Sequence, residues 1–305
     1  LQLGSVTIGQ MGEDLADIKG MAREGCVGIS EDGKSVMNAS LYRRGMRAAK
    51  EAGMIVFAHC EDITMVEGGV MNADARAEEL GLKGITNAVE DVIVARDILL
   101  AKETGVQLHL CHCSTADSVK MLREAKKDGI HVTGEVCPHH FILTSDDIIS
   151  DDGNFKMNPP LRSKEDVEAI KQALKDGVME VISTDHAPHH ADEKAKPFTQ
   201  APFGIVGLET AVALTITNLV RTGWLTPMQM IAYMSTNPAK VLGIDKGTLK
   251  PGSCADVTVI MPDESYVIDA ASFASKGKNT PFDGQKVWGR VALTIADGKI
   301  IYENK

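Results

Sequence analysis

Short apolar runs alternate with longer amphipathic segments along most of the chain. Runs such as 54–60 (MIVFAHC) and 106–113 (VQLHLCHC) have the length of buried strands, while 40–53 and 116–129 repeat apolar residues at helical spacing. Six such strand–helix units follow one another. The strands are expected at 1–9, 26–30, 54–60, 106–113, 130–138 and 179–185, and the helices at 12–25, 40–53, 85–105, 116–129, 163–177 and 207–223.

This alternation predicts an α/β fold in which parallel strands are joined by right-handed helical crossovers. A closed (β/α)8 TIM-type barrel has eight such units, so residues 1–243 are interpreted as about six of the eight. Because Leu1 already lies in a strand-like run, the N-terminal strands are expected to be missing from the chain. An open doubly wound sheet is the alternative, but the chain has no Gly-rich phosphate loop of G-x-G-x-x-G spacing.

The pattern changes at about residue 244. Residues 247–261 and 291–303 alternate apolar and polar positions at strand spacing, and Asp297 with Gly298 forms a two-residue hairpin signal. Residues 244–305 are therefore predicted to be part of a small β-sandwich at the C-terminus.

Composition narrows the classes of partner. The net charge of −10 and the pI of about 5.4 disfavour a nucleic-acid partner, which needs clustered Lys and Arg. No apolar run approaches the roughly 20 residues of a membrane span, and no signal peptide is visible. Six scattered cysteines are typical of reduced thiols. We expect a cytoplasmic protein that acts on a small molecule. A homodimer is one expected assembly, although the sequence contains nothing that sets the oligomeric state.

Polar residues stand where the predicted strands end. Asp32 follows one strand, His59 and His112 end two others, and Asp185 follows a fourth in the segment 182–190 (ISTDHAPHH). Parallel barrels place their chemistry at the carboxyl ends of strands, and imidazole and carboxylate are donors that bind divalent metals. Each residue alone has an ordinary structural explanation, such as a turn or a hydrogen-bonded histidine. Their coincidence at one end of the predicted barrel indicates a metal site.

Two further histidine-rich stretches are less clear. Strand alternation puts His112 on one face and Cys111 and Cys113 on the other, which disfavours a thiolate site. His139 and His140 follow the strand at 130–138 and could orient metal ligands or simply form a polar strand exit.

Several stretches together resemble the dihydroorotase family, of the bacterial type in which an aspartate bridges two zinc ions. The order and spacing of the stretches make the resemblance specific, and it runs along nearly the whole chain. The stretches are FAHCED (57–62), HLCHCST (109–115), EVCPHH (135–140), KMNPPLR (156–162), STDHAPH (183–189), APFGIVGLET (201–210) and GKNTPF (277–282).

The resemblance implies an activity and a set of roles. Dihydroorotases interconvert N-carbamoyl-L-aspartate and L-dihydroorotate in pyrimidine biosynthesis. Zinc can polarise the cyclic amide and lower the pKa of water to about 7, and a carboxylate can move the proton. The implied residues are Asp32 as the bridge between zincs, His59 and His112 as ligands of one zinc, Asp185 as ligand of the other and as general base and acid, Asn158 and His189 as substrate ligands, and the backbone of Phe203 and Gly204 against the substrate ring.

One departure from the family pattern concerns the second zinc. The family has a His-x-His pair at the end of its first strand, and no pair at that position occurs here. Two zincs are expected per complete site, but the chain as it stands is expected to hold at most one tightly and to be inactive.

Two alternative functions stay open. A hydantoinase or allantoinase would need a lysine at the end of the 26–30 strand. Asp32 stands there instead, and Lys34 lies beyond the turn at Gly33. A non-catalytic dihydroorotase-like subunit that scaffolds a transcarbamoylase would be expected to have lost metal ligands that this chain retains.

Overall fold

The computed structural model describes residues 1–304, which form two compact units. The first unit comprises Leu1–Val136, Leu143–Asp147 and Pro159–Met179. The second comprises Cys137–Ile142, Ile148–Asn158 and the chain from Glu180 onward. Each unit is described by itself. No helix in the described residues is both long and apolar enough to cross a membrane.

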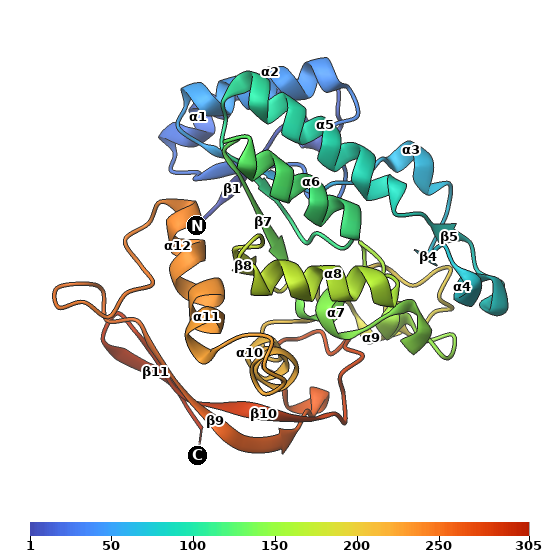
Figure 1. The fold of residues 1–305 in the computed structure, drawn as a ribbon, viewed down its shortest axis with the longest axis vertical. Helices are drawn as coiled ribbons and strands as arrows, with labels where there is room; N and C mark the ends of the chain where they lie inside the picture. Colours follow the sequence, from blue (N-terminus) through green and yellow to red (C-terminus); the bar gives the residue numbers. More distant parts are fainter. Residues whose placement is uncertain (305) are drawn as a thin grey trace. The chain divides into compact units, whose positions relative to one another are not determined.

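Parallel strands form the centre of the first unit (Figure 1). They are β1 (Leu3–Ser5), β2 (Gly28–Ser30), β3 (Ile55–Ala58), β6 (Leu108–Leu110) and β7 (Val132–Val136), side by side in that order. The parallel α/β arrangement predicted from the sequence is confirmed for these strands. Since all run the same way, their carboxyl ends lie along one edge.

Helices of the first unit pack on one another in chain order (Figure 1). They are α1 (Ile18–Arg23), α2 (Ala39–Glu51), α5 (Ala88–Thr104), α6 (Ala116–Lys127) and α8 (Lys164–Lys175). The side chains of Asn38, Thr115 and Ser163 accept from backbone N–H groups in the first turns of α2, α6 and α8, which fixes where these helices begin. The core beneath them is aliphatic, with Ile29, Val56 and Leu108 fully buried.

The N-terminal strand and helix are shorter than predicted. The strand expected at 1–9 is limited to β1 and is followed by a 3-10 turn, η1 (Ile8–Gln10). The helix expected at 12–25 begins only at Ile18, because the Asp17 side chain caps it by accepting from the N–H of Gly20.

The segment 61–85, expected as a loop, contains four short elements. They are α3 (Ile63–Val66), β4 (Met71–Asn72), α4 (Ala75–Leu80) and β5 (Gly84–Ile85), with β4 parallel to β5. Elements of two to six residues are too short for a periodic signal. A short 3-10 turn, η2 (Ser145–Asp147), completes the first unit.

The helical part of the second unit is also built from short elements. They are α7 (Pro138–Ile142), η3 (Gly153–Phe155), α9 (Ala191–Lys194), α10 (Ala211–Thr215), η4 (Ile216–Val220), α11 (Pro227–Ile231), η5 (Ala232–Thr236), α12 (Asn237–Leu242) and η6 (Ala270–Ser272). The helix predicted at 207–223 is confirmed as α10 and the π-helical η4. The helices at 227–242 were not predicted, although the capping box of Thr226 and Gln229 and the N1 proline Pro227 signal a helix start.

The strands of the second unit are β8 (Val181–Ile182), β9 (Val257–Val267), β10 (Lys286–Ala296) and β11 (Lys299–Glu303). The last three form an antiparallel sheet in the order β11-β10-β9. The predicted hairpin at Asp297 and Gly298 is confirmed. Both residues have positive φ, 49° and 75°, as a two-residue type I′ turn requires.

Candidate active site

Asp32, His59 and His112 come together in the first unit. Their donor atoms form a triangle: His59 Nδ1 lies 3.0 Å from His112 Nε2, and Asp32 Oδ1 lies 3.4 and 3.5 Å from these two nitrogens. Ligands about 2.0 to 2.1 Å from a tetrahedral zinc ion would be roughly 3.4 Å apart. The three side chains therefore have the spacing of one face of a metal coordination tetrahedron.

The order of the strands explains why these three residues meet. Asp32, His59 and His112 follow β2, β3 and β6, which are consecutive neighbours in the parallel sheet. The two histidines are buried, whereas the Asp32 side chain is 57 % exposed. The triangle is thus closed on the side of the histidines and open to solvent at the carboxylate.

The backbone at His112 departs from strand geometry. Strand β6 ends at Leu110, and His112 has a φ of 32°, a left-handed value that is uncommon for a residue other than glycine. The predicted strand at 106–113 was therefore too long. Because β6 ends before residues 111–113, strand alternation does not assign the side chains of Cys111, His112 and Cys113 to opposite faces. Non-glycine residues in this conformation cluster at functional sites, where the surrounding fold enforces them.

Glu61 orients His59 from behind the triangle. The Nε2 atom of His59 lies 3.1 Å from Glu61 Oε2, while Nδ1 faces His112 and Asp32. The hydroxyl of Ser35 donates to the carbonyl of His59 and accepts from the N–H of Glu61, which fixes the turn between these residues. A carboxylate on the far nitrogen of a ligating histidine is a common second layer of metal sites.

The charges within the triangle stabilise one another. Hydrogen bonds from His112 and His59 hold the pKa of the Asp32 carboxyl well below its usual range. Burial alone would lower the pKa of His59, but hydrogen bonds to Asp32 and Glu61 outweigh it and raise the pKa to about 9. Binding of a metal to His59 would therefore displace a proton.

A second group of possible metal donors lies in the second unit. Donor atoms of Cys137, His139 and His140 lie within 4.8 Å of one another, and all three residues are buried at the start of α7. The Cys137 thiol also lies 3.4 Å from the hydroxyl of Ser183. The two histidines are thus packed inside the unit.

The residues expected to bind substrate all belong to the second unit, and three of them meet. The ring Nε2 of His189 lies 2.8 Å from the carbonyl oxygen of Phe203, so this nitrogen carries the proton. Gly204 has a φ of 120°, and an added Cβ would lie 2.5 Å from the Cβ of Ala187, so only glycine fits there. Asn158 is half-buried two residues after Lys156, whose carbonyl accepts from the N–H of Gly204.

Asn279 connects these residues. Its Oδ1 accepts from the backbone N–H of His189, and its Nδ2 donates to the carbonyls of Ala187 and Gly204. Asn279 stands in GKNTPF, one of the stretches noted in the sequence, but a position 75 residues from Gly204 gives no local sign of this role.

Asp185 lies in the second unit, three residues after β8. It is half-buried and has a φ of 46°, so it is a second candidate site residue with a left-handed backbone. The Nδ1 atom of the next residue, His186, accepts a hydrogen bond from the N–H of Gly207. This bond holds the chain directly after Asp185 in place.

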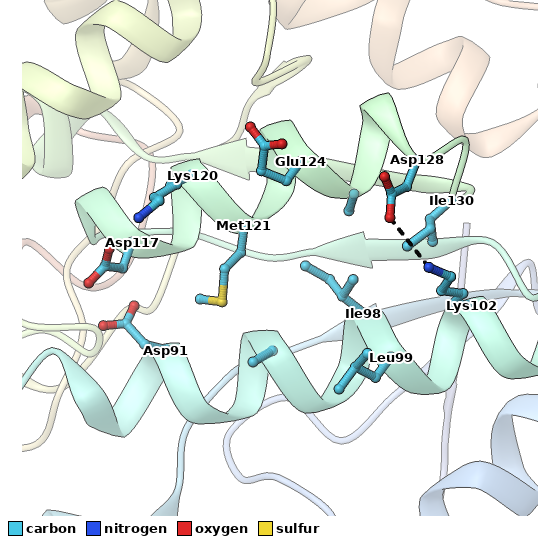
Figure 2. A pocket seen from close by; sticks show the side chains of 12 residues that line it. Asp91, Ile98, Leu99, Lys102, Asp117, Lys120, Met121, Glu124, Asp128 and Ile130 are labelled. Atoms are coloured by element: carbon cyan, nitrogen blue, oxygen red, sulfur yellow. Dashed lines mark hydrogen bonds and ion pairs between the residues drawn. The ribbon is translucent and has the colours of Figure 1, made fainter.

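A groove on the first unit contains none of these residues. It has a volume of about 500 Å³ and lies between α5 and α6, with Ile98, Leu99 and Met121 along its floor and charged side chains at its rim (Figure 2). It has no histidine, cysteine or asparagine, and none of the candidate metal donors lines it.

Comparison with known proteins identifies the family. The sequence profile of the amidohydrolase family matches residues 4–301. The chain therefore belongs to the amidohydrolase family. Within it, the chain is a member of the dihydroorotases. Proteins named dihydroorotase from Pelotomaculum thermopropionicum and Geobacter metallireducens are 51% and 50% identical to it, each over 99% of this chain and 71% of their own length.

Solved structures agree on the fold. The L-hydantoinase (dihydropyrimidinase) from Arthrobacter aurescens superimposes with a TM-score of 0.86 at 27% identity, over 99% of this chain and 69% of that one. The dihydropyrimidinase from Brevibacillus agri has a TM-score of 0.82 at 24% identity, which shows the fold alone.

Proposed function

We propose that this chain acts as a metal-dependent dihydroorotase, which reversibly cyclises N-carbamoyl-L-aspartate to L-dihydroorotate. The observation that supports it most is the triangle of Asp32, His59 and His112 at metal-ligand spacing, in a chain half identical to proteins named dihydroorotase. The donor set of two imidazoles and one carboxylate suits zinc. Zinc as the metal, and two ions per complete site, belong to this proposal. The residues that would hold zinc are Asp32, His59, His112 and Asp185.

A bound divalent metal would supply Lewis-acid polarisation of the scissile carbonyl and a water of lowered pKa. The proton transfers are assigned to residues of the protein. In hydrolysis of dihydroorotate the amide C–N bond of the ring breaks, a water oxygen joins the carbonyl carbon, and the ring nitrogen gains a proton. We assign Asp185 the task of taking that proton from water and returning it to the nitrogen.

Substrate binding is assigned to Asn158, His189 and the backbone of Phe203 and Gly204. His189 already uses its Nε2 proton on the carbonyl of Phe203. To donate to a substrate carboxylate, its ring must therefore present a proton on Nδ1 as well, or release Phe203 and turn. The substrate carboxylate and the Phe203 carbonyl therefore either share one imidazole or compete for it.

Further proposals concern the setting of the enzyme. We interpret the described units as the larger part of a (β/α)8 barrel at 1–243 and a portion of a β-sandwich at 244–305. The six cysteines are scattered along the sequence, a pattern typical of reduced thiols, which supports a cytoplasmic location. A small-molecule substrate follows from the proposed activity, and a homodimer stays a prediction that the molar mass in solution tests.

The proposed function is tested by turnover assays with three cyclic amides. Metal-loaded full-length protein is expected to open dihydroorotate and to leave hydantoin and allantoin almost untouched, and removal of the metal by a chelator is expected to abolish turnover. The likeness to L-hydantoinase makes hydantoin the sharpest competitor. Preferential opening of hydantoin would replace the proposal with that activity.

A further inference from the structure

Lys194 has its ammonium group buried among backbone carbonyls of the second unit. The residue is 5% exposed, and its Nζ donates to the carbonyl oxygens of Lys156, Pro202 and Gly204 at 3.1, 2.9 and 2.9 Å. An ammonium group has three N–H donors, and each of them has one carbonyl acceptor here. No carboxylate is hydrogen-bonded to Nζ among the described residues.

These three carbonyls belong to the segments that carry the candidate substrate residues. Pro202 and Gly204 flank Phe203, and Lys156 lies two residues before Asn158. The carbonyl of Lys156 accepts from both Lys194 Nζ and the N–H of Gly204. The buried ammonium group of Lys194 therefore links the 202–204 backbone to the segment that leads to Asn158.

The carbonyl of Gly204 accepts a second hydrogen bond, from Asn279. Asn279 also accepts from the backbone N–H of His189, and His189 contacts the carbonyl of Phe203. Lys194 and Asn279 thus both donate to the carbonyl of Gly204, next to Phe203. Lys194 does so from the interior of the unit, while Asn279 links this carbonyl to His189.

The charge on Lys194 matters to this arrangement. A neutral amine has two N–H donors and a lone pair, so one of the three carbonyls would face a lone pair and lose its donor. Burial, together with repulsion from Lys156, lowers the pKa of Lys194 to about 8, while Asp152 acts in the opposite direction. On its own helix, Asp192 and Glu193 are exposed.

Lys156 is a second cation close to residues 202–204. Its Nζ donates to the carbonyl of Phe198 at 2.6 Å and lies 4.5 Å from the centre of the Phe203 ring. Lys156 therefore supports the side chain of Phe203, whereas Lys194 supports the backbone on both sides of it.

We propose that Lys194 is a positioning residue of the substrate site, which orders the 202–204 backbone through three carbonyls and weakens substrate binding when it loses its charge. This inference rests on the proposed function, because it assumes that the 203–204 backbone contacts the substrate. The affected quantity is substrate affinity and not the chemical step, since Lys194 Nζ is buried and donates to backbone carbonyls and not to a candidate catalytic group.

The test compares Lys194→Met, which keeps the length of the side chain without its charge, with the control Lys196→Met on an exposed residue two positions away. Lys194→Met is expected to raise KM for dihydroorotate at least tenfold and to change kcat less than about threefold, because a set of charge-assisted hydrogen bonds is lost. In the unsubstituted enzyme KM is expected to rise above about pH 8. Lys194→Met should lack that rise, and Lys196→Met should keep it.

A second measurement does not depend on activity. Hydrogen exchange of the Gly204 amide, corrected for the intrinsic effect of pH, is expected to be at least tenfold faster in Lys194→Met and to accelerate above about pH 8 in the unsubstituted chain alone. Unchanged exchange in Lys194→Met, or a KM that stays flat between pH 7 and 9.5, overturns the positioning role. If Lys194→Met does not fold, the pH dependence of KM and of Gly204 exchange in the unsubstituted protein decides.

The two proposals fail in different ways. Unsubstituted full-length protein that does not turn over dihydroorotate contradicts the proposed function, and Gly204 exchange still tests the ordering of residues 202–204. Faster exchange in Lys194→Met with an unchanged KM would mean that Lys194 orders the loop but that substrate does not use it, which overturns the inference while leaving the activity in place.

Discussion

His59 and Glu61 lie two residues apart, and their side chains meet where ring Nε2 and carboxylate Oε2 are 3.1 Å apart. The carboxylate fixes the ring so that Nδ1 points at His112 and Asp32. Histidine ligands that lose such a partner commonly lose ten- to a hundredfold in metal affinity.

We therefore expect Glu61→Gln to weaken zinc binding at least about tenfold, because an amide accepts a hydrogen bond without adding negative charge to the ring. The dissociation constant is measured by competition with a chromophoric chelator. The control is Glu67→Gln, an exposed residue at the end of α3. Equal affinities in Glu61→Gln and the unsubstituted protein would show that Glu61 does not orient a ligand.

Asp185→Asn is expected to lower kcat for dihydroorotate by at least roughly a hundredfold, the scale of lost general acid–base catalysis. The amide keeps the size of the side chain but cannot take up a proton. Asp192→Asn removes a carboxylate from an exposed position on α9 and should leave kcat unchanged. Near-normal turnover in Asp185→Asn would remove this residue from the mechanism.

Arg162 is buried in the first unit and is expected to matter for stability. It donates to Ser114, Asn72 and the carbonyl of Ile85 and lies 3.6 Å from the Glu90 carboxylate. Arg162→Met leaves that carboxylate buried without its cation, so the free energy of unfolding should fall by about 3 to 5 kcal/mol.

Urea titration measures this loss, with Arg123→Met as the control. Arg123 pairs with Asp176 at the surface, where such pairs contribute about 1 kcal/mol or less. A loss below about 1 kcal/mol in Arg162→Met would contradict the prediction. The stretch KMNPPLR (156–162), which supported the resemblance to the family, thus ends in a buried network.

Asp97 predicts a pH dependence of stability. Burial raises the pKa of its carboxyl from 3.8 to about 6, although Arg96 opposes the shift. The folded state therefore binds this proton more tightly than the unfolded state. The resulting stabilisation is complete below about pH 3.8 and is lost as the pH rises through about 6.

The unfolding free energy of the unsubstituted protein, minus that of Asp97→Asn, should decrease by about 2 kcal/mol between pH 3.8 and pH 6.5. Urea titrations at a series of pH values measure the difference, and Asp128→Asn, at an exposed position, is the control. A difference that is flat over this range, or that grows with pH, would contradict the assignment.

Much of the secondary structure of this protein could be predicted from local sequence patterns. Short apolar runs predicted the parallel strands, and longer segments between them predicted the helices α2, α5, α6 and α8, since helices of three turns or more extend over enough residues to be recognised. The hairpin at Asp297 and Gly298 followed from two residues that tolerate positive φ. Strand order then places Asp32, His59 and His112 at one edge, as expected.

Other features depended on contacts between distant parts of the chain. The left-handed backbone at His112, which ends the alternation of β6, is enforced by the surrounding fold and not by residue type. Glu61 is an ordinary acidic residue in sequence and becomes a partner of His59 only because the turn through Ser35 brings it there.

The sequence by itself determined the fold class, the family and the residue types of the triangle formed by Asp32, His59 and His112, because periodicity and motif spacing are properties of the chain. The tertiary structure decided which groups hold these side chains and the 202–204 backbone in place. Lys194 meets the carbonyl of Lys156 across 38 residues and Asn279 meets that of Gly204 across 75. Such hydrogen bonds join a side chain to backbone carbonyls, which every residue type possesses, so no local pattern marks their acceptors.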